Sequence, residues 1–318
     1  MTTVGLDVGG TKILGVVLDA DGAVLAEGRV MTPRGADALL GALDDVIAEL
    51  AAEAGKADAV GIGVPGLVDR SGTLRFAPNL PGVLELPVAA HVGERAGVPV
   101  RVDNDATCAA WAEHEEGAGR GFDDMVLVTL GTGIGSGIVA DGRVLRGAFG
   151  FAGEVGHTVV ERDGIACPCG RRGCWERYAS GSGLGRLGRD AVYAGHGRRI
   201  AELAGDPEDV RGEHVTRAAL EGDAEALAVL GELADWLAIG LVNIVNVLDT
   251  ALLVIGGGLV SAGDALLAPT RRSFSVRLLA AGHRPDVPIR AASMGERAGA
   301  VGAALLAREA AGGAATPA

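Results

Sequence analysis

Aromatic residues are scarce in this sequence of 318 residues, at 3%, while the hydrophobic share reaches 48%. The core must therefore consist mainly of Ala, Val, Leu and Ile, which suits helices packed on sheets. Lysine is also scarce, since Lys12 and Lys56 are the only two and almost all positive charge is Arg, and 41 Asp and Glu residues against 28 Lys and Arg give a net charge of −13. Proteins that bind nucleic acid usually carry a basic patch. The excess of negative charge therefore disfavours binding to nucleic acid or to an anionic membrane surface.

We expect neither a secretory signal nor a membrane span in this sequence. The opening MTTVGLDVGG has no basic segment followed by an apolar one, so we expect no secretory signal. The most apolar stretch, 237–255, is interrupted by Asn243, Asn246 and Asp249, so we do not expect it to span a membrane. We expect a cytoplasmic protein. Single cores stop growing near about 250–300 residues, so this length favours two lobes.

A pattern of strand, Gly/Thr turn, strand and Asp-Gly turn opens the chain and then recurs. The first copy covers 4–22, with its Gly/Thr turn at 9–12, and the second covers 126–142, with its turn at 131–133. Internal duplication indicates two related lobes. Apolar periodicity and turn residues predict the other main elements. These are helices at 36–54, 88–96, 106–116, 224–248 and 298–310, and strands at 23–29, 59–64, 98–102, 143–145 and 251–255.

The glycine turns suit the phosphates of a nucleotide. Glycine lets backbone N–H groups approach phosphate, Thr11 adds a hydroxyl and Lys12 a charge, while Asp7 can hold Mg²⁺. A third glycine cluster at 256–258 lies between an apolar strand and a predicted helix, where nucleotides often bind. Plain hairpins and a flexible turn remain the alternatives. The predicted ATP and Mg²⁺ residues are Asp7, Gly9, Gly10, Thr11, Lys12, Gly131, Thr132, Gly133, Gly256 and Gly257.

Three polar residues, Asp103, Asn104 and Asp105, lie where a predicted strand runs into a predicted helix. Asn and Asp are favoured helix N-caps, but a cap explains only one of the three. A carboxylate at this junction can also accept a hydroxyl proton during phosphoryl transfer. Both interpretations stay open from the residues alone.

A dense cysteine cluster is the strongest motif. Cys167, Cys169 and Cys174 lie within eight residues, and with His157 they supply three thiolates and one imidazole, a complete tetrahedral zinc set. Because protein atoms fill all four positions, we expect structural zinc. The alternative is buried free cysteine, which fits Cys108 well.

Two glutamates flank this loop, Glu154 before His157 and Glu176 after Cys174. If zinc fixes the loop, both carboxylates are carried into defined positions, where they can accept hydrogen bonds from the hydroxyl groups of a ligand. Taken singly, each could instead be a solvated surface residue.

Together these motifs resemble the ROK family (repressors, open reading frames and kinases). The matching pieces, in the family's order, are 7–12, Asn104-Asp105, 130–137, 154–157, the Cys-x-Cys-Gly-x-x-Gly-Cys-x-Glu motif at 167–176, and 256–258. The resemblance implies an α/β, actin-like (ribonuclease-H-like) sugar kinase fold, with two lobes and a central cleft. Within the family, the segments 117–121, 131–137 and 174–181 look most like those of bacterial glucokinases.

This resemblance also implies a reaction, the ATP-dependent phosphorylation of glucose at its 6-hydroxyl, with Asp105 as general base. Structural zinc, at His157, Cys167, Cys169 and Cys174, would orient the sugar site. The implied sugar-binding residues are Asn79, Asn104, Asp105, Glu154, His157 and Glu176. We expect a small lobe at 1–105, with the helix near 298–311 packed back on it, a large lobe at 106–297 and a disordered tail at 312–318.

Several alternatives stay open. The sugar could be another hexose, such as mannose, fructose or an N-acetyl amino sugar, and the phosphoryl donor could be polyphosphate, although the acidic chain offers no cationic track for it. A non-enzymatic sugar sensor is the alternative from another class. Family repressors carry an N-terminal helix-turn-helix, whereas here the phosphate turn begins at Asp7, so we expect no DNA binding. Family members often form dimers or tetramers, so we expect a homo-oligomer.

Overall fold

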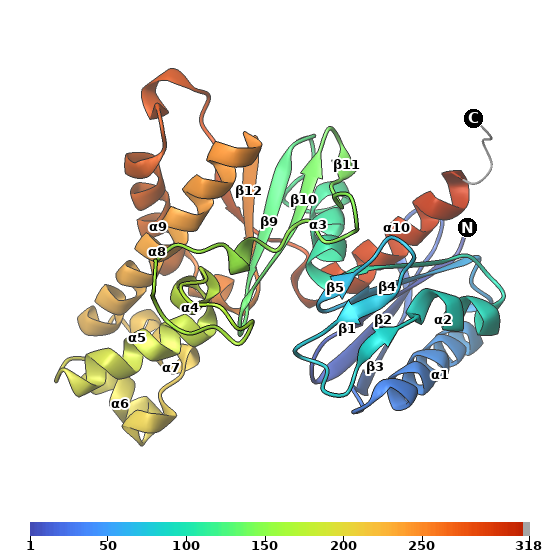
Figure 1. Cartoon of the computed structure of the whole chain (residues 1–318), viewed down its shortest axis with the longest axis horizontal. Coiled ribbons are helices and arrows are strands. Elements are labelled where there is room, and N and C mark those ends of the chain that lie inside the picture. The colour runs from blue at the N-terminus through green and yellow to red at the C-terminus, as the bar shows by residue number, and fades with distance from the viewer. Residues whose placement is uncertain (314–318) are drawn as a thin grey trace. The chain divides into compact units, whose positions relative to one another are not determined.

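A computed structural model describes residues 1–313 (Figure 1). Contacts between residues divide the chain into two units. The first unit contains Met1–Asp123, Gly137–Gly153 and the chain from Ser293 onward. The second unit contains Asp124–Ser136 and Glu154–Ala292. Each unit has its own buried core.

The first unit is built on a five-stranded sheet with the order β3-β2-β1-β4-β8. Strand β1 pairs antiparallel with β2 and parallel with β4, and β4 pairs parallel with β8. Strand β2 also pairs antiparallel with β3. The strands are β1 Thr3–Val8, β2 Lys12–Leu18, β3 Val24–Met31, β4 Ala59–Val64 and β8 Val100–Asn104.

Helices cover both faces of this sheet. Side chains of α1 (Ala36–Ala54) pack near Leu6, since a β-carbon built on Gly15 would lie 2.7 Å from Leu50 and 2.9 Å from Leu6. The neighbouring strand residue Gly5 faces α10 (Ala298–Gly313) instead. Successive residues of a strand point to opposite faces, so α1 and α10 lie on opposite faces. The other helices of this unit are α2 (Val88–Ala96), α3 (Asp105–Glu115) and the short η5 (Gly295–Arg297).

Two strand glycines let α10 lie directly on the sheet. Gly5 of β1 and Gly61 of β4 are register partners. A β-carbon on Gly5 would lie 2.0 Å from the carbonyl oxygen of Ala300, and one on Gly61 would lie 1.8 Å from that of Ala303. No side chain fits there, so both positions require glycine.

A small sheet of three short strands, β5-β6-β7, also belongs to the first unit. Its strands are β5 Leu67–Val68, β6 Leu74–Phe76 and β7 Leu84–Leu86. Two- and three-residue strands are too short to show an alternating pattern, and the sequence did not predict them.

The other large sheet has the order β11-β10-β9-β12-β13. In both large sheets, the first strand of the repeat, β1 or β9, lies between the strand that follows it along the chain and a parallel strand, β4 or β12. This correspondence confirms the predicted duplication. The division between the units falls within β10. The strands are β9 Met125–Leu130, β10 Ile134–Ala140, β11 Arg143–Val144, β12 Leu252–Gly256 and β13 Ile289–Ala291.

The second unit is rich in helices around α8 (Ala224–Leu248). Helix α8 is long and apolar enough to cross a membrane by length and composition, yet 61% of its most apolar window is buried within the protein, so it is a core helix. The remaining helices are η1 Val155–His157, α4 Glu176–Ala179, α5 Gly181–Tyr193, α6 Arg198–Ala204, η2 Pro207–Asp209, α7 Gly212–Leu220, η3 Gly258–Ala262, α9 Asp264–Arg277 and η4 Ala281–His283.

Several predicted elements match the structure residue for residue, namely 36–54, 59–64, 88–96, 134–140 and 224–248. We predicted the first lobe to end at residue 105, but contacts place the chain up to Asp123, and 137–153, in the first unit. The reason is that α3 packs on α10, where a β-carbon on Gly302 would lie 1.7 Å from the carbonyl oxygen of Cys108. Helix α10 continues through Gly313, and the rest of the predicted tail lies outside the described residues.

Candidate active site and metal centre

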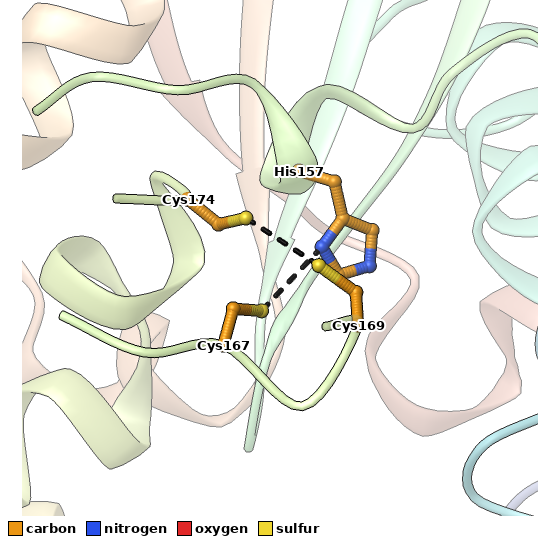
Figure 2. A group of neighbouring side chains, drawn as sticks. All are labelled: His157, Cys167, Cys169 and Cys174. Atoms are coloured by element: carbon orange, nitrogen blue, oxygen red, sulfur yellow. Dashed lines mark hydrogen bonds between the residues drawn. The ribbon is translucent and has the colours of Figure 1, made fainter. Parts of the chain in front are cut away.

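His157 and three cysteines of the second unit form one cluster (Figure 2). Their ligand atoms all lie within 4.8 Å of one another. Nδ1 of His157 lies 3.8 Å from Sγ of Cys167, and the sulfurs of Cys169 and Cys174 are 3.6 Å apart. Four ligands around tetrahedral zinc, at about 2.3 Å for sulfur and 2.1 Å for nitrogen, are separated by roughly 3.5–3.8 Å. The side chains therefore fit a zinc ion in both chemistry and spacing.

The cysteine loop turns sharply at its glycines. Gly170 and Gly173 have φ angles of +88° and +76°, which favour glycine. A β-carbon on Gly173 would lie 1.8 Å from the carbonyl oxygen of Glu161. A β-bridge between Val159 and Cys174 joins the two ends of the loop. These turns bring sulfurs that are separated in the sequence to one point.

The thiols differ in proton affinity when no metal is present. Burial raises the pKa of Cys167 to about 12. Burial also acts to raise the pKa of Cys169, but hydrogen bonds from the backbone and side chain of Arg171 and from the other two thiols lower it to about 6. Because metal ligands must be thiolates, metal binding at neutral pH must release protons.

Glu176 lies between this cluster and the second glycine turn. Its Oε1 atom accepts a hydrogen bond from Cys167 at 3.2 Å and lies 3.8 Å from Nδ1 of His157. Its Oε2 atom accepts the backbone N–H of Ile134 at 3.4 Å. The opposite imidazole atom, Nε2 of His157, lies 3.9 Å from Glu154. The two imidazole nitrogens of His157 thus have different neighbours, with the sulfur atom of Cys167 near Nδ1 and the Glu154 carboxylate near Nε2.

The turn at Gly131, Thr132 and Gly133 is tied to the start of α5. The N–H of Gly181 donates to the carbonyl of Gly131 at 2.8 Å, and the hydroxyl of Ser182 donates to that of Thr132 at 2.7 Å. The third glycine cluster lies against the end of β9. Gly257 has φ +81°, and its β-carbon would lie 2.6 Å from the backbone nitrogen of Leu130. The second unit therefore brings two predicted nucleotide turns to the C-terminal end of β9, and the turn at 131–133 lies beside Glu176, which contacts the metal-ligand cluster.

Trp175 anchors this region to α8, and no local sequence pattern predicts this contact. The indole is fully buried, and its Nε1–H donates to the carbonyl oxygen of Trp236 at 2.8 Å. It occupies the space beside Gly240, where a β-carbon would lie 1.9 Å from the ring. Because Trp175 separates Cys174 from Glu176 in the sequence, its burial fixes both neighbours.

In the first unit, the turn from Gly9 to Lys12 is closed by a hydrogen bond of 2.8 Å from the N–H of Gly9 to the carbonyl oxygen of Lys12. The hydroxyl of Thr32 donates to the carbonyl of Gly9 at 2.7 Å. The Nζ atom of Lys12 is 2.9 Å from the carboxylate of Glu296. Asn79 borders the turn, since a β-carbon built on Gly10 would lie 3.5 Å from the backbone carbonyl oxygen of Asn79.

The three polar residues at the end of β8 have three separate roles. Asn104 is the N-cap of α3, and its side chain accepts the N–H of Thr107 at 3.1 Å. Asp103 is buried and pairs with Arg146 at 2.7 Å, a partner that the sequence did not predict. Asp105 is the first residue of α3 and accepts the N–H of Ala106 at 2.8 Å. The cap is therefore Asn104, and Asp105 is not needed for it.

Asp7 and Asp105 both have raised pKa values, and the charge of Asp105 contributes to the shift of Asp7. Burial raises the pKa of Asp105 above its ordinary value. Burial, and to a lesser extent the negative charge of Asp105, raise the pKa of Asp7 to about 7 against the opposing effect of Lys12. Strongly shifted carboxyl groups are typical of functional sites. The first unit thus brings the predicted base together with the predicted magnesium ligand.

The two related sheets and their helices have the actin-like sugar kinase fold that the family resemblance implied. A family model described as "ROK family" matches residues 3–310, and the chain belongs to this family. A crystal structure of a ROK family glucokinase from Streptomyces griseus, in complex with glucose and AMPPNP, is 40% identical with a TM-score of 0.84, and the match covers 97% of this chain and 100% of that one.

Curated relatives extend the comparison. The glucokinase of Streptomyces coelicolor is 40% identical over 311 residues, which cover 96% of this chain and 98% of the relative. The N-acetylmannosamine kinase of Escherichia coli O157:H7 is 33% identical over 317 residues, which cover 97% and 99%. Relatives at this level of similarity therefore include kinases for different sugars.

Proposed function

We propose that this chain is a glucokinase, which transfers the terminal phosphoryl group of ATP to the 6-hydroxyl of glucose with Asp105 as general base. The observation that carries the proposal is the position of Asp105. It begins α3 beside Asp7, and the capping role there belongs to Asn104. The full-length similarity to glucokinases, one of them crystallised with glucose and an ATP analogue, supports the donor and the acceptor.

As general base, Asp105 would accept the proton of the 6-hydroxyl while the oxygen attacks the phosphorus atom. A base is most effective when its pKa lies near the working pH, and burial raises the pKa of this carboxyl in that direction. The N–H of Ala106 holds one carboxylate oxygen at 2.8 Å, so the side chain has a fixed orientation. The other oxygen is then the acceptor for the proton.

The phosphates would be held by the glycine turns. The N–H groups of Gly9 and Gly131 close the two turns through the carbonyl oxygens of Lys12 and Gly133. We therefore assign the backbone N–H groups of Gly10 and Gly133, with Thr11 and Thr132, to the phosphates, and Gly256 and Gly257 to the adenosine side. Lys12 would offset the charge that develops on the phosphoryl oxygens. Asp7 would hold Mg²⁺, directly or through water. In this structure Lys12 pairs with Glu296, so phosphate binding requires Lys12 to share or exchange this partner.

Zinc would be structural here, because His157, Cys167, Cys169 and Cys174 fill all four positions of a tetrahedral ion. When bound, it would fix the loop from Glu154 to Glu176 and carry no reaction step. We assign the sugar hydroxyls to Asn79, Asn104, Glu154, His157 and Glu176, in addition to Asp105. His157 has a nitrogen for each task, since Nδ1 lies near the sulfur of Cys167 and Nε2 near Glu154.

Another hexose is the main alternative, because the N-acetylmannosamine kinase of E. coli is 33% identical. A coupled assay decides between sugars. Glucose with ATP should give the highest kcat/KM among glucose, mannose, fructose, N-acetylmannosamine and N-acetylglucosamine, and polyphosphate should replace ATP poorly. Preference for an amino sugar would replace glucose in the proposal. Sugar binding without turnover would instead indicate a sensor.

We expect the enzyme to act in the cytoplasm, where ATP is available and thiols stay reduced. The cysteines in the described chain are all free, as metal ligation requires. A homo-oligomer remains our expectation from the family resemblance.

A further inference from the structure

Glu113 is a fully buried carboxylate on α3 that the proposed reaction does not use. Its Oε1 atom accepts the N–H groups of Ser293 and Met294, both at 2.8 Å. Its Oε2 atom accepts the N–H of Ala118 at 2.8 Å and the hydroxyl of Ser293 at 3.2 Å. Burying a carboxylate is costly unless it is hydrogen-bonded. These four bonds offset that cost and give the side chain one defined position.

The hydrogen bonds of Glu113 join segments that are distant in the sequence. Ala118 follows the end of α3, whereas Ser293 is where the chain re-enters the first unit after Ala292. The neighbouring Gly117 leaves room for this arrangement, since a β-carbon there would lie 2.2 Å from Oε2 of Glu113. Glu113 therefore determines where the segment that begins at Ser293 is held.

The segment from Ser293 to Gly299 supports the first phosphate turn. Glu296 lies 2.9 Å from Nζ of Lys12 and 3.3 Å from a guanidinium nitrogen of Arg29. Gly299 lies against Asp7, since a β-carbon on it would be 2.5 Å from the carboxyl carbon of Asp7. Asp7, just before the turn, and Lys12, at its end, thus both contact this segment. Glu113 binds the first two backbone N–H groups of the same segment.

We propose that Glu113 is a positioning residue for nucleotide binding: it holds the segment from Ser293 to Gly299, which sets Asp7 and Lys12 for the phosphates and Mg²⁺. This inference rests on the proposed function, in which these two residues contact the nucleotide. Glu113 itself contacts neither substrate. Its loss should therefore weaken nucleotide binding and leave glucose binding nearly unchanged.

Glu113→Gln tests the role with almost no change of volume. Both carboxylate oxygens accept backbone N–H groups, so the NH₂ group of Gln faces a donor whichever way the amide turns. We expect the Kd for AMPPNP with Mg²⁺, measured by titration calorimetry, to rise about tenfold, while the Kd for glucose changes less than twofold. The KM for ATP should rise by the same factor as the Kd for AMPPNP.

Glu115→Gln is the matched control, because Glu115 lies on the same helix, is exposed and pairs only locally with His114. We expect both Kd values to stay at those of the wild type. A lower melting temperature of Glu113→Gln with an unchanged Kd for AMPPNP would mean that Glu113 only stabilises the fold, and this would overturn the proposal. Equal weakening of glucose and AMPPNP binding would overturn it too.

If Glu113→Gln does not fold, Ser293→Ala decides the question, since it removes one donor and leaves the carboxylate. An increase of about threefold in the Kd for AMPPNP, at constant Kd for glucose, supports the role, and no increase contradicts it. The wild type separates this inference from the proposed function. If the wild type does not bind AMPPNP, both proposals are contradicted. If the wild type binds AMPPNP and the variants bind it equally well, only the role of Glu113 is contradicted.

Discussion

The indole of Trp175 occupies the space beside Gly240 that a side chain would need, with 1.9 Å between the ring and a β-carbon built on the glycine. Trp175 lies between Cys174, a metal ligand of the proposed site, and Glu176, a proposed sugar ligand. The contact with α8 therefore holds the C-terminal end of the cysteine loop independently of any metal.

Gly240→Ala should destabilise the protein. Overpacking a core costs about 1–3 kcal/mol, and the better helix propensity of Ala returns at most about 1 kcal/mol. We expect a net loss of roughly 1–2 kcal/mol in urea unfolding, with a shift in tryptophan fluorescence. Gly231→Ala on the same helix is the control, because nothing lies within 4 Å of its β-carbon, and it should stabilise by about 0.5–1 kcal/mol. Equal effects of the two substitutions would contradict the contact.

Asp105→Asn should lower kcat by roughly 10²–10⁴-fold, the usual contribution of a general base. Glucose affinity, measured by titration calorimetry, should change less than threefold. In the wild type, kcat should fall as the pH falls through the pKa of Asp105, which burial raises, because the protonated carboxyl cannot accept a proton. The residual activity of Asp105→Asn should lack this acidic limb. Near-normal turnover by the variant would remove Asp105 from the mechanism.

Asp7→Asn should stabilise the ligand-free protein at alkaline pH. An acid whose pKa is raised on folding binds its proton more tightly in the folded state, so its contribution to stability is lost as the pH rises from about 4 to about 7. At pH 8 we expect the free energy of unfolding of Asp7→Asn to exceed that of the wild type by about 2 kcal/mol. A full shift would give about 1.4 kcal/mol for each pKa unit, and we take roughly half of that because the side chain is partly exposed. Near pH 4 the variant and the wild type should be equally stable in denaturant titrations. A variant less stable than the wild type at pH 8 would count against this account.

Metal analysis of freshly purified protein should find one zinc ion per chain. A chelator should lower the melting temperature, because structural zinc contributes folding energy directly. Cys174→Ser should lose the metal. Cys108→Ala should keep it, since this buried thiol lies on α3 in the first unit, outside the cluster. Wild-type protein that is free of zinc yet fully stable would contradict the site.

Local signals explain what was predictable. The helix at 36–54 and the strands around the glycine turns follow from periodicity and turn residues, and the cysteine spacing predicts the metal set. The pairing of Asp103 with Arg146 and the place of Trp175 beside Gly240 depend on residues 43 and 65 positions apart, whose proximity no local pattern encodes. The three short strands from Leu67 to Leu86 could not be predicted because their local pattern is too short, since each has too few residues to show alternation.

The glycines Gly5 and Gly61 have a consequence for synthesis of the chain. They lie under α10, which is made after the second unit, whereas β1 and β4 are made before it. The part of the first sheet around Gly5 and Gly61 therefore stays uncovered while the second unit is translated, and α10 covers it only after this helix has left the ribosome. Contacts between segments that are far apart in the sequence are slow to form. A ribosome-bound chain that stops before Ala298 should expose this part of the sheet to chaperones, and a released chain that includes α10 should not.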